Sequence, residues 1–227
     1  MAEVVISTAR TTPITTANAT GTGPDSIRLA NGGGIVVASG SAVTVNSSNN
    51  FEATVGSGIT MTESASGSTG LLIEGGNTSN ITIAGAIAVT DDVDPADDLD
   101  TDNDGTPDGP FASGTDRAGI RLVGASPLTG NIILTDTASI AVDGNESYGI
   151  LLGAGLNGKL VSQANITTIG NNSYGIRTTG DRDRTAVFAT DRDGAGDLDR
   201  AGDVAGRADA VAVVPGHRDV GLGDELA

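Results

Sequence analysis

The sequence predicts an all-β fold, a parallel β-helix in which each short coil of chain lies on the coil before it. Residues 140–153 and 166–180 share seven identical positions at a constant offset of 26 along the chain, which is typical of a solenoid. Up to residue 180, short runs of Ile, Val, Leu and Thr alternate with Gly, Asn, Ser and Asp, as strands alternate with turns. Phe, Tyr and Trp supply only five of the 227 residues, so the core must be narrow and aliphatic.

The repeat is strongest at two motifs, NESYGI at residues 145–150 and NNSYGI at residues 171–176. Looser copies lie upstream, at Gly119 and at Gly70. The interval between these two glycines is 49, and leaving out an insertion of length 23 restores the period of 26. The interval from Gly119 to Gly149 is 30, and a four-residue bulge near Ser126 explains why it exceeds the period.

Each repeat contains three short strand-like runs, such as residues 120–123, 132–134 and 139–142. Stacking the repeats pairs each run with its equivalent in the next coil, about 4.8 Å away. Ile and Leu then fill the interior, while Gly and Asn at the corners supply the positive φ angles that tight bends require. Residues 35–62 carry further runs of this kind, so we expect five to seven rungs in all.

The chain divides into three parts. Residues 1–26 are expected to be an N-terminal cap or an extended segment, and residues 27–180 the β-helix, with an acidic loop insertion at residues 90–116. Residues 181–227 lack Ser, Asn and Ile and consist mainly of Asp, Arg, Ala, Gly and Val. This tail is expected to be disordered, or to be non-native sequence from a shifted reading frame, and neither alternative forms a packed domain.

Composition and charge exclude several classes of function. The formal net charge is −17, with one histidine and no cysteine. Nucleic-acid binding and docking on an anionic membrane both need a basic face, so neither is expected. Without cysteine there is no disulfide, thiolate zinc site or cysteine nucleophile. No run approaches the roughly 18 apolar residues of a membrane span, and an export signal is expected to lie outside this chain.

The clearest candidate for ligand binding is a calcium-loop pattern inside the insertion. Carboxylates occupy its positions 1, 3, 5 and 9, with Gly105 at position 6 and a backbone carbonyl at position 7. Position 12 is Phe111, so the bidentate carboxylate is missing and we expect a weak site, with Kd on the order of 10⁻⁴–10⁻³ M. The alternative is a solvated acidic loop that keeps the rod soluble. The predicted calcium ligands are Asp100, Asp102, Asp104, Thr106 and Asp108.

Two ladders of stacked side chains are expected on the rungs. Tyr148 and Tyr174 are separated by one full period, which predicts a stacked pair at a corner, with a platform for glycans as the alternative. Asn80 and Asn131 precede the same strand in successive rungs, and they predict a hydrogen-bonded asparagine ladder that Lys159 ends.

Three features give the sequence a family resemblance: the NESYGI/NNSYGI repeat, the stretch SGSAVTVNSSNN at residues 39–50, and GPFASGTDRAGIRL at residues 109–122, after the acidic stretch. At these motifs the sequence resembles the passenger regions of bacterial autotransporters, over about residues 3–180. The resemblance implies a right-handed β-helix that is displayed outside the cell and joined to a C-terminal translocator barrel. It therefore implies an extracellular or bacterial cell-surface location, and we expect this chain to be the first part of a passenger, before the barrel.

The expected function is that of a non-catalytic structural stalk or adhesin, and no catalytic residue is predicted. A polysaccharide lyase or hydrolase is the alternative that shares this fold, and it needs paired carboxylates or acids clustered with Arg or Lys on one face. Arg121 and Arg177 lie two rungs apart with Leu151 between them, and the acids outside the insertion and the tail share no equivalent position on successive rungs. A third alternative is a broken, non-functional reading frame. The expected partners are an unidentified surface or cell-envelope component and, end to end, a second copy of the chain.

Overall fold

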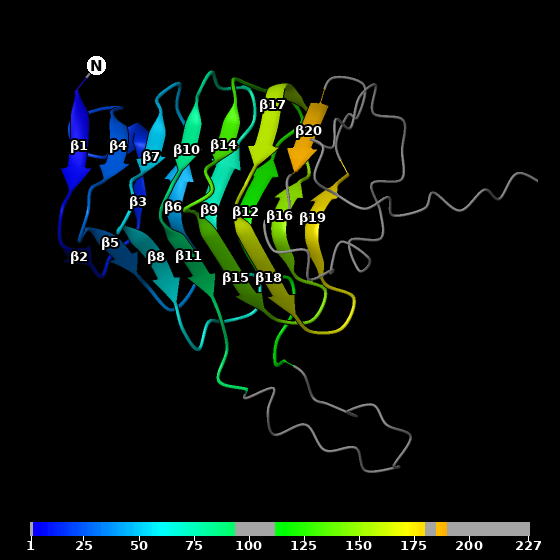
Figure 1. Cartoon of the computed structure of the whole chain (residues 1–227). Helices are drawn as coiled ribbons and strands as arrows, with labels where there is room; N and C mark the ends of the chain where they lie inside the picture. The colour runs from blue at the N-terminus through cyan, green and yellow to red at the C-terminus, as the bar shows by residue number, and fades with distance from the viewer. Residues whose placement is uncertain (1, 94–111, 180–184, 190–227) are drawn as a thin grey trace, which may run out of the picture.

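A computed structural model describes residues 2–93, 112–179 and 185–189. Three parallel sheets run along the molecule, and consecutive strands pass from one sheet to the next, so that three strands complete a turn (Figure 1). Two of the sheets contain six stacked strands each. The predicted all-β parallel β-helix of five to seven rungs is therefore confirmed.

The strands are short, and successive turns add to each sheet, with sheet A taking two short strands from one of the turns. Sheet A contains β1 (Glu3–Ile6), β4 (Ser26–Leu29), β7 (Phe51–Ala53), β10 (Ile81–Ile83), β13 (Leu128–Thr129), β14 (Ile132–Leu134), β17 (Leu156–Ser162) and β20 (Thr185–Ala189). Sheet B contains β2 (Ala9–Arg10), β5 (Gly34–Val36), β8 (Gly58–Met61), β11 (Ala86–Val89), β15 (Ser139–Asp143) and β18 (Asn165–Ile169). Sheet C contains β3 (Ile14–Thr15), β6 (Ser41–Val45), β9 (Thr69–Glu74), β12 (Ala118–Val123), β16 (Tyr148–Leu152) and β19 (Tyr174–Thr178).

Helix is nearly absent from the described ranges, where a single 3₁₀ turn, η1 (Thr16–Asn18), follows β3. None of the helical structure in these ranges is long and apolar enough to cross a membrane.

Columns of aliphatic side chains form the core between the three sheets. In sheet B, Ile35, Ile59, Ile87 and Ile140 lie on one another in register, and each is at most 1% exposed. Burying each such side chain stabilises the fold by roughly 1.5–3 kcal/mol. The narrow interior is thus filled mainly by aliphatic side chains, as the composition predicted, with Phe51 as a buried ring among them.

The period predicted from the motifs holds in the last turn but not in the earlier ones. Ile140 pairs with Ile166, which confirms the offset of the two motifs. The turn from Ile35 to Ile59 is shorter than this period, whereas the turn from Ile59 to Ile87 is longer. The strands keep their pairing because the differences in turn length fall in exposed corner loops, where insertions disturb the packing little.

Close packing between sheets B and C requires a glycine at two positions of sheet C, Gly119 and Gly149. A Cβ atom on Gly149 would lie 2.4 Å from Cγ2 of Ile166 and 2.4 Å from the carbonyl oxygen of Gly175. A Cβ atom on Gly119 would lie 2.5 Å from Cγ2 of Ile140. At Gly119 and at Gly149, an isoleucine of sheet B therefore fills the space that a side chain in sheet C would need.

The first turn begins near the N-terminus and carries a charge at one end of the core. Strands β1, β2 and β3 pair with β4, β5 and β6, so the expected cap or extended segment, residues 1–26, contains this turn. Arg10 pairs with Ile35 and so heads the isoleucine column of sheet B. Its side chain donates to the carbonyl oxygen and hydroxyl of Thr12, at 3.0 and 2.9 Å, and to the carbonyl of Pro13 at 3.3 Å.

Strand β20 lies inside the tail that was expected to be disordered or non-native. Its backbone pairs with β17 along its whole length, from Gly158 with Thr185 to Ser162 with Ala189. An open strand edge presents N–H and C=O groups that any extended backbone can meet, so this pairing leaves the nature of the tail as a prediction. Residues 180–184 and 190–227 lie outside the described residues.

Candidate functional site

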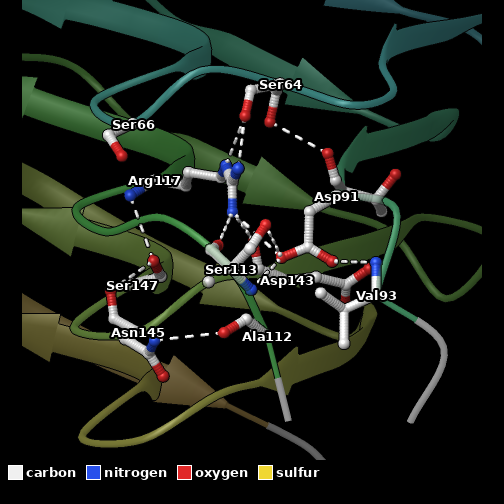
Figure 2. A network of polar contacts seen from close by, with 12 residues as sticks. Ser64, Ser66, Asp91, Val93, Ala112, Ser113, Arg117, Asp143, Asn145 and Ser147 are labelled. Carbon is white, nitrogen blue, oxygen red and sulfur yellow. Dashed lines mark hydrogen bonds and ion pairs between the residues drawn. The ribbon is translucent and has the colours of Figure 1, made fainter. Parts of the chain in front are cut away.

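A buried polar cluster lies where the acidic insertion leaves and rejoins the rod (Figure 2). Asp91 follows β11 of sheet B, and Ser113 precedes β12 of sheet C. Oδ2 of Asp91 accepts hydrogen bonds from the backbone N–H of Ser113 at 2.7 Å and from its hydroxyl at 3.2 Å. The two ends of the insertion therefore meet at one corner of the rod.

Arg117, directly before β12, forms a buried ion pair with Asp91. Its Nη1 lies 3.2 Å from Oδ2 of Asp91, and the two side chains are 3% and 2% exposed. Two other ion pairs, Arg28 with Glu3 and Arg121 with Asp116, are more exposed. Of these three pairs, Arg117–Asp91 is thus the one shielded from water and salt.

The Arg117 side chain also joins three successive turns through backbone carbonyls. Nε donates to Ser64 at 3.1 Å and Nη2 donates to the same carbonyl, in the turn before. Nη1 donates to Ser113 at 2.5 Å and to Asp143, in the turn after, at 2.7 Å. Every guanidinium nitrogen is bonded, so this arginine is suited to holding structure and not to binding a substrate.

Asp143 adds a second carboxyl group beside the ion pair. Burial is the main factor that raises the pKa of Asp143 above its ordinary value, and the neighbouring Asp91 carboxylate raises it further. The charge of Arg117 and a hydrogen bond from the Asp91 backbone act in the opposite direction but are weaker. The cluster therefore holds more negative charge than one arginine compensates.

The repeated motifs form the corner on which this cluster rests. Oγ of Ser147 accepts from the backbone N–H of Arg117 at 3.1 Å, and Oγ of Ser173 accepts in the same way from Ser147. Oδ1 of Asn145 accepts from the N–H of Asn171 at 2.8 Å. The Asn and Ser of the NESYGI and NNSYGI motifs are therefore ladder residues that join one corner to the next.

A second cluster lies on the last two turns of sheet C. The rings of Tyr148 and Tyr174 are stacked, with centroids 6.1 Å apart and planes inclined by 9°, so the predicted tyrosine ladder is confirmed. The guanidinium of Arg177 lies 4.9 Å from the Tyr174 ring and 5.7 Å from the Tyr148 ring. Nη1 of Arg177 is 3.4 Å from the Tyr148 hydroxyl. The sequence did not indicate that this arginine would join the two rings.

The predicted asparagine ladder is also confirmed, and it begins one turn earlier than expected. Oδ1 of Asn50 accepts from the N–H of Asn80 at 2.9 Å, and Oδ1 of Asn80 accepts from the N–H of Asn131 at 3.0 Å. Oδ1 of Asn131 accepts from the N–H of Lys159 at 3.1 Å, where the ladder ends.

The predicted calcium ligands, Asp100, Asp102, Asp104, Thr106 and Asp108, lie outside the described residues. Within residues 2–93 and 112–179, no group of three or more His, Cys, Asp or Glu side chains could hold a metal ion. Calcium binding by the insertion therefore stays a prediction.

Sequence reasoning missed the Arg117–Asp91 pair. The signal was present in the motif alignment, because Arg117 precedes Ala118-Gly119 just as Ser147 precedes Tyr148-Gly149. An arginine in place of the corner serine, next to a long acidic insertion, indicates a buried partner among the acids.

Comparison with known proteins found no family model, no curated protein and no solved structure that matches this chain. Because one fold serves many functions, the β-helix alone does not identify what the protein does. The function must be argued from the two clusters and from the sequence.

Proposed function

We propose that the protein is a non-catalytic, β-helical stalk or adhesin of the passenger type, located outside a bacterial cell or on its surface. A solenoid of stacked turns is a stiff, extended scaffold, and its length grows with each turn. Six stacked strands span about 24 Å. Such a rod suits the display of contact surfaces at a distance from the cell.

The observation that carries this proposal is the buried clamp at the root of the insertion. Arg117 and Asp91 fix both ends of the insertion to one corner, and the carbonyls of Ser64 and Asp143 tie that corner to the turns on either side. Binding loops are commonly held at their base by a rigid scaffold while their tips make the contact. The clamp is therefore consistent with an insertion that serves as a contact element.

Calcium binding at the insertion is the second part of the proposal. The spacing of its carboxylates supports it, and the expected Kd is on the order of 10⁻⁴–10⁻³ M. Calorimetric titration of the chain with calcium chloride should show binding that is lost in the variant D102N/D104N. If the unaltered chain gives no binding heat at millimolar calcium, this part of the proposal is wrong.

An adhesion assay tests the main part. Beads coated with the full chain are expected to attach to intact cells or to extracellular glycan films more than beads coated with serum albumin. The same preparation should release no reducing ends and no unsaturated products from acidic polysaccharides. Attachment no greater than that of albumin would contradict the adhesin role, and product release that depends on the chain would favour the enzyme alternative.

A further inference from the structure

The stacked tyrosines on sheet C are fixed in place before any ligand arrives. Tyr148 and Tyr174 pair in register within β16 and β19, and both side chains are half-buried. Strand pairing holds the rings parallel, so little rotamer freedom remains to be lost on binding. Each ring keeps an apolar body and a hydroxyl group, which suits a ligand that is itself partly apolar and partly polar.

Arg177 differs from the other arginines of the described chain. Arg28, Arg117 and Arg121 each lie within 3.2 Å of a carboxylate oxygen, whereas Arg177 has no such partner among the described residues. Arg10 also lacks one, but it donates to backbone carbonyls and a hydroxyl of its own loop. The hydrogen bond from Arg177 to the Tyr148 hydroxyl uses one of the five N–H donors of the guanidinium.

The outer row of sheet C around Arg177 contains no acid. In register, this row runs from Thr44 through Leu72, Arg121 and Leu151 to Arg177. Arg121 bonds Asp116 from two nitrogens, at 2.9 and 3.4 Å, while its buried Nε has no partner in the described structure. The two guanidinium groups lie two turns apart, roughly 10 Å along the rod.

This row is basic although the chain as a whole is acidic. Of the 29 acidic residues, 11 lie in the described ranges, and the other 18 lie in residues 94–111 and 181–227. Long-range repulsion of an anionic ligand is screened beyond about 8 Å at physiological salt, whereas contact with a guanidinium is not. An anion can therefore bind here despite the net charge.

We propose that Tyr148, Tyr174 and Arg177 form a subsite for a carboxylated sugar unit of an acidic glycan. The tyrosine rings would contact the apolar C–H face of the sugar, and Arg177 would donate paired hydrogen bonds to its carboxylate. A simple anion uses only the arginine and a neutral sugar uses only the rings, so the combination selects an acidic sugar. This inference rests on the adhesin proposal and names the ligand class of that surface.

Calorimetric titration of the full chain with a short galacturonate oligomer, in buffer containing EDTA, tests the subsite. We expect binding that weakens with salt, that is about tenfold weaker for the galactose oligomer of equal length, and that falls about tenfold in Arg177→Gln. Tyr174→Leu should lose affinity similarly. Arg28→Gln, a change to an ion-paired arginine on sheet A, should have no effect. Circular dichroism and the Tm verify that each variant is folded, and Arg177→Lys, which keeps the charge but not the planar fork, replaces the glutamine variant if that does not fold.

Several results would overturn the inference. These are no binding by the unaltered chain at millimolar oligomer, equal binding by the glutamine variant, or equal binding of the neutral oligomer. Equal binding of an aspartate oligopeptide would show that the site takes any polyanion and is not selective for a sugar. If the beads of the adhesion assay still attach while the subsite fails, the adhesin proposal stands and only the ligand class is wrong.

Discussion

Replacing Arg117 by methionine tests whether the clamp holds the rod together at the insertion. Methionine keeps most of the length of the aliphatic stem but removes the guanidinium. Asp91 then stays buried without its counter-charge, and the carbonyls of Ser64 and Asp143 lose a donor. Both losses fall at one corner of the rod, where the insertion is rooted.

The size of the effect follows from the burial of the pair. Because the two side chains are only 3% and 2% exposed, water cannot replace the lost partner. Breaking such a pair costs about 3–5 kcal/mol. For a protein of this size that corresponds to a fall in Tm of about 6–20 °C.

Arg121→Met is the matched control, since it makes the same change inside β12, the strand that Arg117 precedes. The Asp116 side chain that pairs with Arg121 is 56% exposed. An exposed pair contributes about 0–1 kcal/mol, so this variant should melt within a few degrees of the unaltered chain.

Urea unfolding followed by circular dichroism gives the free energies, and hydrogen exchange shows where stability is lost. We expect faster exchange at β11, β12 and β15, the strands next to the clamp. In Arg117→Met/Asp91→Ala, removing the orphaned carboxylate should recover part of the loss. If Arg117→Met costs no more than Arg121→Met, or if the double variant shows no coupling, the clamp does not stabilise the rod as argued.

Three further changes test the remaining features. Because the pKa of Asp143 is raised, Asp143→Asn should gain stability in a pH-dependent way. Below the ordinary aspartate pKa the variant and the unaltered chain should be equally stable, and as pH rises through the folded-state pKa the unaltered chain should become the less stable. Urea unfolding midpoints at about pH 3 and pH 7 would show this difference. A gain of equal size at both pH values would contradict this. Gly149→Ala should cost about 1–3 kcal/mol, because its Cβ would overlap atoms 2.4 Å away, whereas Gly23→Ala, with nothing within 4 Å, should be nearly neutral in the same thermal melts. Asn80→Ala removes one exposed ladder bond and should lower the free energy of unfolding by about 0.5–1.5 kcal/mol, and no change would mean that water replaces the bond.

The sequence predicts the fold well because each rung obeys a local rule. Gly70, Gly119 and Gly149 each precede a Leu or Ile of sheet C, since Ile87, Ile140 and Ile166 of sheet B leave no room for a side chain at these points. A constraint repeated in successive turns is visible without coordinates. Turns of other lengths, such as the one from Ile35 to Ile59, obey the same packing rule but leave no constant offset.

The clamp was missed because it occurs once and joins residues from different turns. Asp91 is one of many acids in the acidic stretch, and nothing local distinguishes it as the one that Arg117 selects. The placement of Arg177 against two tyrosines was missed for another reason: the sequence predicts the register of Tyr148 and Tyr174, but not the direction in which the Arg177 side chain extends.

Arg10 at the head of the isoleucine column limits how rods can join. For a second copy to lay its final turn on this end, Ile166 of one molecule would have to cover Arg10 of the other and strip its charge of water. Head-to-tail growth into open filaments is therefore disfavoured. At this end of the described rod, the cost of burying Arg10 thus acts against the stacking of another copy on sheet B.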